Sequence, residues 1–218
     1  DQMAPKATLM SSAMAPPATW DWRDLDGVTA IKNQKQCGSC WAFATNAAIE
    51  SAIKIMDGID VDLSEQWLVS CNTSGWGCGG GWYAYNYYMT GGSLDDCGEN
   101  GGVLGQYFPY VAYEAACNCP YPHEYWIDGW SYVYSASQVA PVDDIKQAVM
   151  EWGPVAVGAY VHDSWYAYNG GLFNDCQNQS VNHTVLVVGW DDDYEGSGEG
   201  VWIVKNSWGA DWGDEGYM

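Results

Sequence analysis

Residues 34–43 read QKQCGSCWAF and hold two cysteines three positions apart. A C-x-x-C pair can form a redox couple, supply half of a zinc site, or combine two cysteines with separate tasks. The sequence disfavours the first two alternatives. Residues 27–36 do not form the strong strand that a thioredoxin-like motif needs, and no second C-x-x-C or nearby histidine completes a zinc site.

The third alternative gives Cys40 a chemical role of its own. Residues 40–56, CWAFATNAAIESAIKIM, are rich in alanine and long apolar side chains and contain no glycine or proline. This pattern predicts a buried helix that begins at Cys40. A thiol at a helix N-terminus meets free backbone N–H groups and positive partial charge, which favour the thiolate. Cys40 is therefore a candidate nucleophile that still needs a base.

The candidate base is one of three histidines. His123 lies in a proline-rich loop, and the position of His162 after a strand indicates a surface residue. His183 opens the apolar run HTVLVVGW, where a lone histidine is more often structural than catalytic. A neighbouring strand at 200–206 would deliver Asn206 beside His183, with the indole of Trp208 covering the pair.

Composition excludes several classes of partner. The 218 residues include 28 acidic residues against 7 lysines and arginines, giving a formal net charge of −21. Nucleic acids and anionic membranes would be repelled by such a surface. Three interpretations of the charge stay open: adaptation to high salt or acid pH, attraction of cationic substrates, and simple solubility. The longest apolar runs are too short for a transmembrane helix. Eight cysteines predict disulfides and an oxidising compartment.

A helical half precedes a β-rich half. Further helices are predicted at 65–71 after the N-cap Ser64, at 82–89, and at 142–152, and strands at 154–161, 183–190 and 200–206. We expect an α+β protein of two domains with a cleft between them. Residues 1–15 would be a propeptide remnant or flexible extension, 16–127 a mainly helical domain with the nucleophile, and 128–218 a β-rich domain. The acidic segment 191–200 lacks the twelfth-position glutamate of a calcium loop, so no metal site is expected.

Four motifs in order, QKQCGSCWAF, CGGGW, NHTVLVVGW and KNSWGADWGDEGY, resemble the papain family of cysteine peptidases. The resemblance runs from about residue 21 to Met218 and implies a papain-like fold. It implies that Cys40 is the nucleophile, that His183 is the general base and acid, and that Asn206 orients the imidazole. Gln34 and the Cys40 backbone N–H would form the oxyanion hole.

The resemblance also implies which residues meet the substrate. Gly80 and Gly81 would offer backbone groups to an extended peptide. The pocket for the second residue before the cut would be lined by Trp82, Tyr83, Gly158 and Thr184, with Trp208 beside the catalytic pair.

Disulfides follow partly from the resemblance, which implies the pairs Cys37–Cys78 and Cys71–Cys117. We add Cys97–Cys119, because both cysteines lie in segments that look inserted. Cys176 is then left over. Because the matching cysteine in relatives bonds one near the C-terminus, we expect the natural chain to continue past Met218.

These features together predict a secreted or lysosome/vacuole-like cysteine endopeptidase that works through an acyl-enzyme. Its partners would be protein or peptide substrates and a propeptide or proteinaceous inhibitor. We expect a monomer without cofactor, nucleic acid or membrane partners. Two alternatives remain: a catalytically silent papain-like binding or storage protein, and a thiol–disulfide oxidoreductase, which the C-x-x-C context disfavours.

Overall fold

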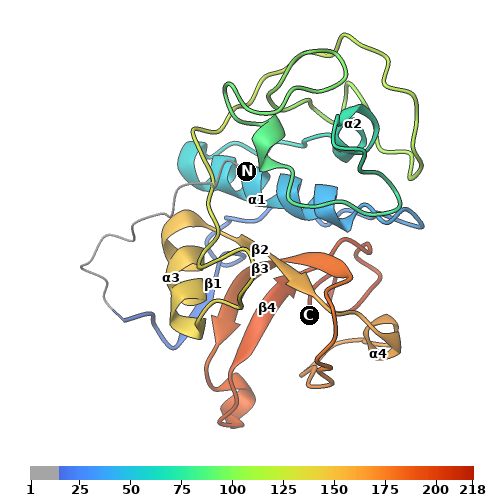
Figure 1. The fold of residues 1–218 in the computed structure, drawn as a ribbon. Helices are drawn as coiled ribbons and strands as arrows, with labels where there is room; N and C mark the ends of the chain where they lie inside the picture. Colours follow the sequence, from blue (N-terminus) through green and yellow to red (C-terminus); the bar gives the residue numbers. More distant parts are fainter. Residues whose placement is uncertain (1–14) are drawn as a thin grey trace.

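Helices and sheet occupy two sides of the protein in the computed structural model, which describes residues 15–218 (Figure 1). Helices α1 (Cys40–Asp57) and α2 (Glu65–Cys71) lie on the upper side in this view. The sheet and α3 (Val142–Trp152) lie below them. The prediction for residues 1–15 falls, except for Ala15, outside the described residues. No helix of the described chain is long and apolar enough to cross a membrane.

The sheet is antiparallel and is built around one buried strand, β3 (His183–Asp191). Its partners are β1 (Thr19–Asp21), β2 (Val155–Ala159) and β4 (Val201–Lys205). Seven of the nine β3 residues are buried, in agreement with the unbroken apolar sequence of this segment. Strands β2, β3 and β4 confirm the three predicted strands with slightly different bounds.

Local sequence signals explain where the helices begin and end. Ser64 caps α2 by accepting a hydrogen bond from Trp67 N at 2.9 Å, as predicted. Gly58 ends α1 in the left-handed conformation, with φ 68°. Two acidic residues, Asp143 and Asp144, lie in the first turn of α3. Their negative charges stabilise the helix, because its N-terminus carries positive partial charge.

The helix predicted at 82–89 is reduced to one short 3₁₀ turn, η1 (Tyr85–Tyr87). Its hydrogen bonds run three residues back, from Tyr87 N to the Ala84 carbonyl at 3.0 Å and from Tyr88 N to the Tyr85 carbonyl at 2.9 Å. This is the 3₁₀ pattern, which rarely extends beyond a few residues. The sequence also gave no sign of α4 (Asp163–Tyr166) or of η2 (Tyr194–Gly196).

The N-terminal segment crosses to the sheet before α1 begins. Strand β1 pairs with β3, and the indole of Trp20 stacks on Trp190 with ring centroids 6.3 Å apart. Gly189 permits this approach, since a Cβ there would lie 2.1 Å from the Trp20 carbonyl oxygen. The segment 16–127 is thus not purely helical, and the domain boundaries stay a prediction.

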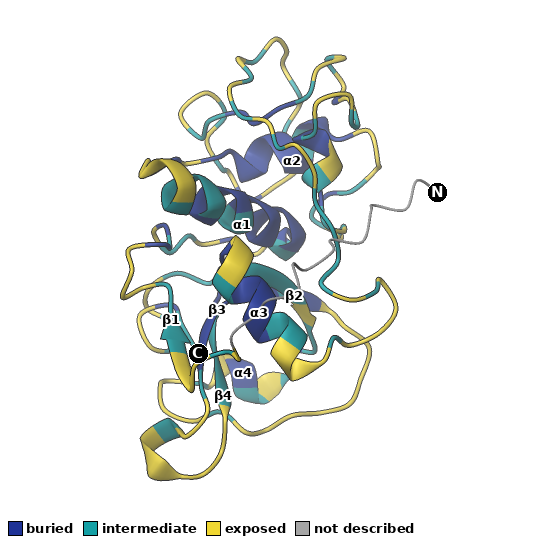
Figure 2. Cartoon of the chain, turned by 90° about the vertical axis from the view of Figure 1, so that its left-hand side faces the viewer, coloured by how far each residue is buried: buried dark blue, intermediate teal, exposed yellow. Residues whose placement is uncertain are grey.

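A buried ionic cluster ties together the loop before α1, the helix itself and the start of α2. The Glu50 carboxylate, 1% exposed, accepts hydrogen bonds from Lys32 Nζ at 2.7 Å, Leu63 N at 2.8 Å and Thr29 Oγ1 at 2.9 Å. Lys32 also bonds Glu65 at 2.9 Å. Burial acts to lower the pKa of Lys32, but the Glu65 and Glu50 carboxylates outweigh it and raise this pKa. Figure 2 shows that much of α1, the helix to which Glu50 belongs, is buried.

Glu50→Ala is expected to lower the free energy of unfolding by about 3–5 kcal/mol, because it removes one partner from a buried, hydrogen-bonded ion pair. The change also leaves the Leu63 amide without its acceptor. Denaturant titration would measure the loss. The exposed Glu199→Ala variant serves as control, with an expected change within about 0.5 kcal/mol. Equal stability of the two variants would contradict this role of Glu50.

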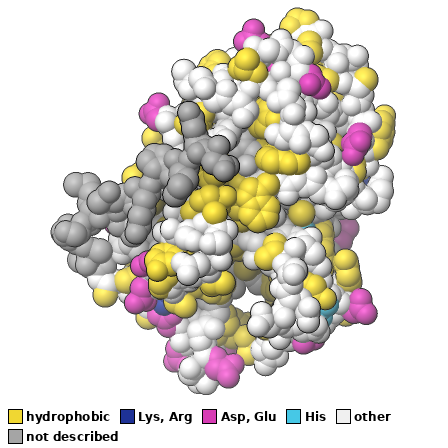
Figure 3. All heavy atoms as spheres, viewed as in Figure 1, with side chains coloured by type: hydrophobic (Ala, Val, Ile, Leu, Met, Phe, Trp, Pro, Cys, Tyr) yellow, Lys and Arg dark blue, Asp and Glu magenta, His cyan; other side chains and the backbone are white. Residues whose placement is uncertain are grey.

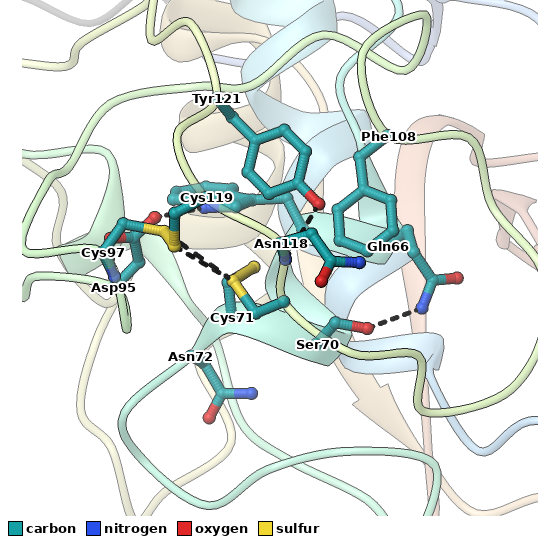
Figure 4. Close-up of a disulfide and its surroundings, with 12 residues drawn as sticks. Gln66, Ser70, Cys71, Asn72, Asp95, Cys97, Phe108, Asn118, Cys119 and Tyr121 are labelled. Atoms are coloured by element: carbon teal, nitrogen blue, oxygen red, sulfur yellow. Dashed lines mark hydrogen bonds between the residues drawn. A yellow bond between two sulfur atoms is a disulfide. The ribbon is translucent and has the colours of Figure 1, made fainter.

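The three predicted disulfides, Cys37–Cys78, Cys71–Cys117 and Cys97–Cys119, are all present. The last two lie against each other, with Cys117 Sγ 3.7 Å from Cys97 Sγ and 3.8 Å from Cys119 Sγ (Figure 4). Cys71–Cys117 fastens the end of α2 to the loop region that follows it, and Cys97–Cys119 joins two parts of that region. Among the described cysteines, Cys40 and Cys176 are unpaired.

Candidate active site

Cys40 is the first residue of α1 and sits next to a disulfide-braced turn. Gly38 lies against the neighbouring chain, where a Cβ would come within 2.5 Å of the Cys78 carbonyl oxygen. The Gly38 amide donates to that same oxygen at 3.0 Å. The Cys37–Cys78 bridge therefore holds the turn that presents the thiol at the helix N-terminus.

His183 and Asn206 come together because antiparallel neighbours place the start of β3 beside the end of β4. His183 is the first residue of β3, and Asn206 directly follows β4. Both side chains are buried, and His183 Nε2 lies 2.8 Å from Asn206 Oδ1. The predicted proximity of these two residues is present in the structure.

A backbone contact decides which nitrogen of His183 carries the proton. The Ser207 amide, which can only donate, bonds Asn206 Oδ1 at 2.8 Å. This atom is therefore an acceptor, and His183 Nε2–H is the donor to it. In the neutral ring, Nδ1 then keeps its lone pair.

Trp208 covers the His183–Asn206 pair, as predicted. Its ring centroid lies 5.1 Å from that of His183. Tyr166 stacks on the other side of Trp208 at 5.0 Å, with an interplanar angle of 7°. The aromatic cover shields the pair from water, which strengthens its hydrogen bond.

Cys40 and His183 are not hydrogen-bonded to each other within residues 15–218. The thiol interacts with the backbone and hydroxyl of Thr184, the residue after His183. Burial raises the pKa of the Cys40 thiol, and the backbone and hydroxyl of Thr184 counteract part of this rise. Burial lowers the pKa of His183, and the Asn206 hydrogen bond counteracts it.

The helix N-terminus acts as expected, since the backbone N–H groups of Cys40 and Trp41 lower the pKa of the thiol, but burial outweighs them. Desolvation disfavours the thiolate and the imidazolium. Direct contact between Cys40 and His183 would stabilise the two charges as a pair. Catalytic hydrogen bonds are often long without substrate and shorten when it binds.

Gln34 is held with its amide group in a defined orientation. The Ser207 hydroxyl donates to Gln34 Oε1 at 2.6 Å, and Gln34 Nε2 donates to the Cys37 carbonyl at 2.9 Å. An amide NH₂ has two hydrogens, so one is left for a second acceptor. Ser207 thus orients both Gln34 and Asn206, a positioning role that the sequence analysis missed, although the residue directly follows Asn206.

The residues expected to meet substrate lie on both sides of the thiol. Neither backbone group of Gly81 takes part in a backbone hydrogen bond in the described chain, so both are free for an extended peptide. The prediction that Gly80 also offers free backbone groups is wrong, because its N–H and carbonyl are both hydrogen-bonded to Gly77, at 3.2 and 3.1 Å. Its φ of 123° favours glycine. Trp82 is exposed, whereas Tyr83 is half-buried.

On the sheet side, Gly158 pairs with Thr184 across β2 and β3. A Cβ on Gly158 would lie 2.8 Å from the Val181 side chain, so Val181 fills the space that a larger residue would take. Val181 was not among the residues predicted from the sequence. The sequence gives little indication that Val181 lies beside Gly158, because more than twenty residues separate the two.

Comparison with known proteins places the chain in a family. The pattern described as "Papain family cysteine protease" matches residues 16–218. Fruit bromelain of Ananas comosus is 36% identical over 207 residues, which cover 94% of this chain and 54% of that protein. Cathepsin L2 of Homo sapiens is 36% identical over 213 residues, which cover 93% of this chain and 60% of that protein.

Solved structures agree with the sequence comparison. The bromelain protease from Ananas comosus in complex with the E64 inhibitor matches with a TM-score of 0.79 at 36% identity, over 93% of this chain and 88% of that one. Digestive procathepsin L2 from Tenebrio molitor matches with a TM-score of 0.82 at 34% identity, over 96% of this chain and 64% of that one. The chain therefore belongs to the papain family of cysteine proteases and has its fold. It spans little more than half the length of the curated relatives named above.

Proposed function

We propose that this protein is a cysteine endopeptidase that uses Cys40, His183 and Asn206. The observation that supports the proposal is the Asn206–His183 hydrogen bond, which occupies Nε2 and leaves Nδ1 of the neutral ring able to accept a proton. A silent binding or storage protein would not need this arrangement of a buried base, its orienting amide and a free thiol.

The residues support an acyl-transfer sequence. Cys40 Sγ attacks the peptide carbonyl carbon while its proton passes to His183 Nδ1, and the carbonyl π electrons move to oxygen. The imidazolium then gives this proton to the leaving amine as the C–N bond breaks, which leaves a thioester on Cys40. Water, deprotonated by His183, attacks the thioester and releases the carboxylic acid and the thiol.

The negative oxygen of each tetrahedral intermediate would be stabilised by two donors. One is the second amide hydrogen of Gln34, whose orientation Ser207 and the Cys37 carbonyl fix. The other is the Cys40 backbone N–H at the start of α1, where the helix leaves its first amides without partners inside the helix.

Gln34→Ala is expected to lower kcat for peptide hydrolysis by about 10²–10³-fold with little change in KM, since the lost donor acts on the transition state. Gln36→Ala is the matched control, because its amide bonds the Ala112 carbonyl at 3.2 Å, outside the candidate oxyanion hole. Steady-state kinetics and an unfolding midpoint should be measured for both. Equal kcat values in the two variants would argue against the Gln34 assignment.

Substrates and location follow from the same proposal. Proteins or peptides would be cleaved, and a propeptide or proteinaceous inhibitor would occupy the same cleft. Three disulfides favour a secreted or lysosome/vacuole-like compartment. Figure 3 shows apolar side chains gathered near the middle of one face, with acidic side chains spread around them. The net charge of −21 would attract cationic substrates.

A further inference from the structure

Four aromatic residues form a continuous surface that we call the aromatic ledge: Trp82, Tyr83, Trp130 and Tyr132. Two come from the segment after Gly81, and two from the segment that leads toward α3. Tyr83 and Tyr132 have ring centroids 6.3 Å apart, and Tyr132 and Trp130 have centroids 5.2 Å apart. Trp82 contacts Tyr83 at 5.2 Å.

Both indole N–H groups of the ledge have hydrogen-bond acceptors. Trp82 Nε1 donates to the Tyr132 hydroxyl at 3.0 Å, and Trp130 Nε1 donates to Asn86 Oδ1 at 2.7 Å. Tyr85 packs against Tyr83 and Trp130 at 6.1 and 5.4 Å, which supports the rings. Rings held in this way can take up an apolar partner without losing much conformational entropy. Trp82 is 48% exposed, and the other three rings are half-buried.

The ledge continues from the candidate site and is not a separate patch. Burial raises the pKa of Tyr83 to about 12, with smaller contributions from Tyr132 and from Cys40. Tyr83 therefore lies within electrostatic range of both Cys40 and Tyr132. A peptide paired with the free backbone of Gly81 would pass directly over these rings.

The spacing of the rings matches that of an extended peptide. Side chains on one face of such a peptide repeat every second residue, or about 6.6 Å. This is close to the 6.3 Å between Tyr83 and Tyr132. A peptide whose second residue before the cut contacts Tyr83 would therefore place its fourth residue at Tyr132 and Trp130.

We propose that Trp130 and Tyr132 form a further substrate subsite, which selects an apolar or aromatic side chain at the fourth residue before the scissile bond. This inference rests on the proposed function, since it requires a peptide in the cleft. It adds a specificity role for the segment before α3, from which the sequence predicted no substrate contact.

The test uses peptide amides that share their three residues before the cut and carry Phe, Leu, Gly or Glu at the fourth. The unmodified chain should cleave the Phe peptide about three- to tenfold faster than the Gly peptide, the range typical of one aromatic contact. In Tyr132→Ala the ratio of the two kcat/KM values should fall to about one. In Tyr132→Phe, which keeps the ring, the preference should persist.

The ratio of kcat/KM values for two peptides, measured on one variant, does not change when part of the protein is inactive. Trp152→Ala is the control, because Trp152 is 65% exposed at the end of α3 and makes no ledge contact; its ratio should equal that of the unmodified chain. Cleavage of all four peptides at equal rates by the unmodified chain would overturn the subsite while leaving the peptidase proposal intact. Cleavage of none of them would overturn the peptidase proposal.

Discussion

Replacing Cys40 by serine is expected to lower kcat/KM for peptide hydrolysis by about 10⁶-fold, the order of loss seen when a protease nucleophile is removed. A serine hydroxyl is much less acidic than a thiol, so it cannot form with His183 the ion pair that supplies the reactive thiolate. The fold should persist, because Cys40 belongs to none of the three disulfides. Hydrolysis of a fluorogenic peptide amide and a thermal unfolding curve measure the two quantities.

The matched control is Cys176→Ser, which removes the exposed free cysteine. Its activity should equal that of the unmodified chain. If Cys176→Ser abolished hydrolysis while Cys40→Ser retained it, the nucleophile would have been assigned to the wrong thiol.

Asn206→Ala is expected to lower kcat within the range of about 10²–10⁴-fold that positioned acid–base catalysis contributes. Without the Oδ1 acceptor, His183 loses the hydrogen bond that fixes its ring and its tautomer. This hydrogen bond also raises the pKa of His183 against burial. Its loss should lower the pKa, so the imidazolium releases its proton at a lower pH.

The pH profile separates this effect from simple damage to the fold. In the proposed mechanism the alkaline limb of kcat/KM reports loss of the imidazolium proton, so this limb should move to lower pH in Asn206→Ala. Asn178→Ala changes an exposed asparagine and should leave the profile unchanged. A reduced rate with the alkaline limb unmoved, or moved to higher pH, would show that Asn206 does not act through His183.

Elements with a strong local pattern could be predicted from the sequence. Helix α1 has an alanine-rich run and β3 an unbroken apolar run, and each begins at the predicted residue. Strand β1 could not be predicted, because three residues carry too little periodicity and their stability comes from pairing with β3. The 82–89 helix was overestimated: the segment forms only one 3₁₀ turn, whose amides bond carbonyls three residues back.

The residues of the candidate site could be predicted from the sequence, but the shift in the pKa of the Cys40 thiol could not. The motifs around Cys40, His183 and Asn206 pointed to these residues, and the structure brings the last two within hydrogen-bonding distance. The helix N-terminus suggested a lowered thiol pKa, whereas burial acts in the opposite direction. Burial depends on how the two halves pack, and no local pattern reports it. The Ser207 contacts to Gln34 and Asn206 are likewise tertiary.

The central claim is that Cys40 is the nucleophile of a thiol peptidase, and covalent labelling tests it most directly. The purified chain would be titrated with E64, the inhibitor bound in the matching bromelain structure, while peptide hydrolysis is followed. The labelled protein would then be digested and mapped by mass spectrometry. Our account predicts that activity falls in proportion to added inhibitor and that the adduct lies on Cys40 alone. Full activity in excess inhibitor, or an adduct on Cys176 with Cys40 unmodified, would contradict it.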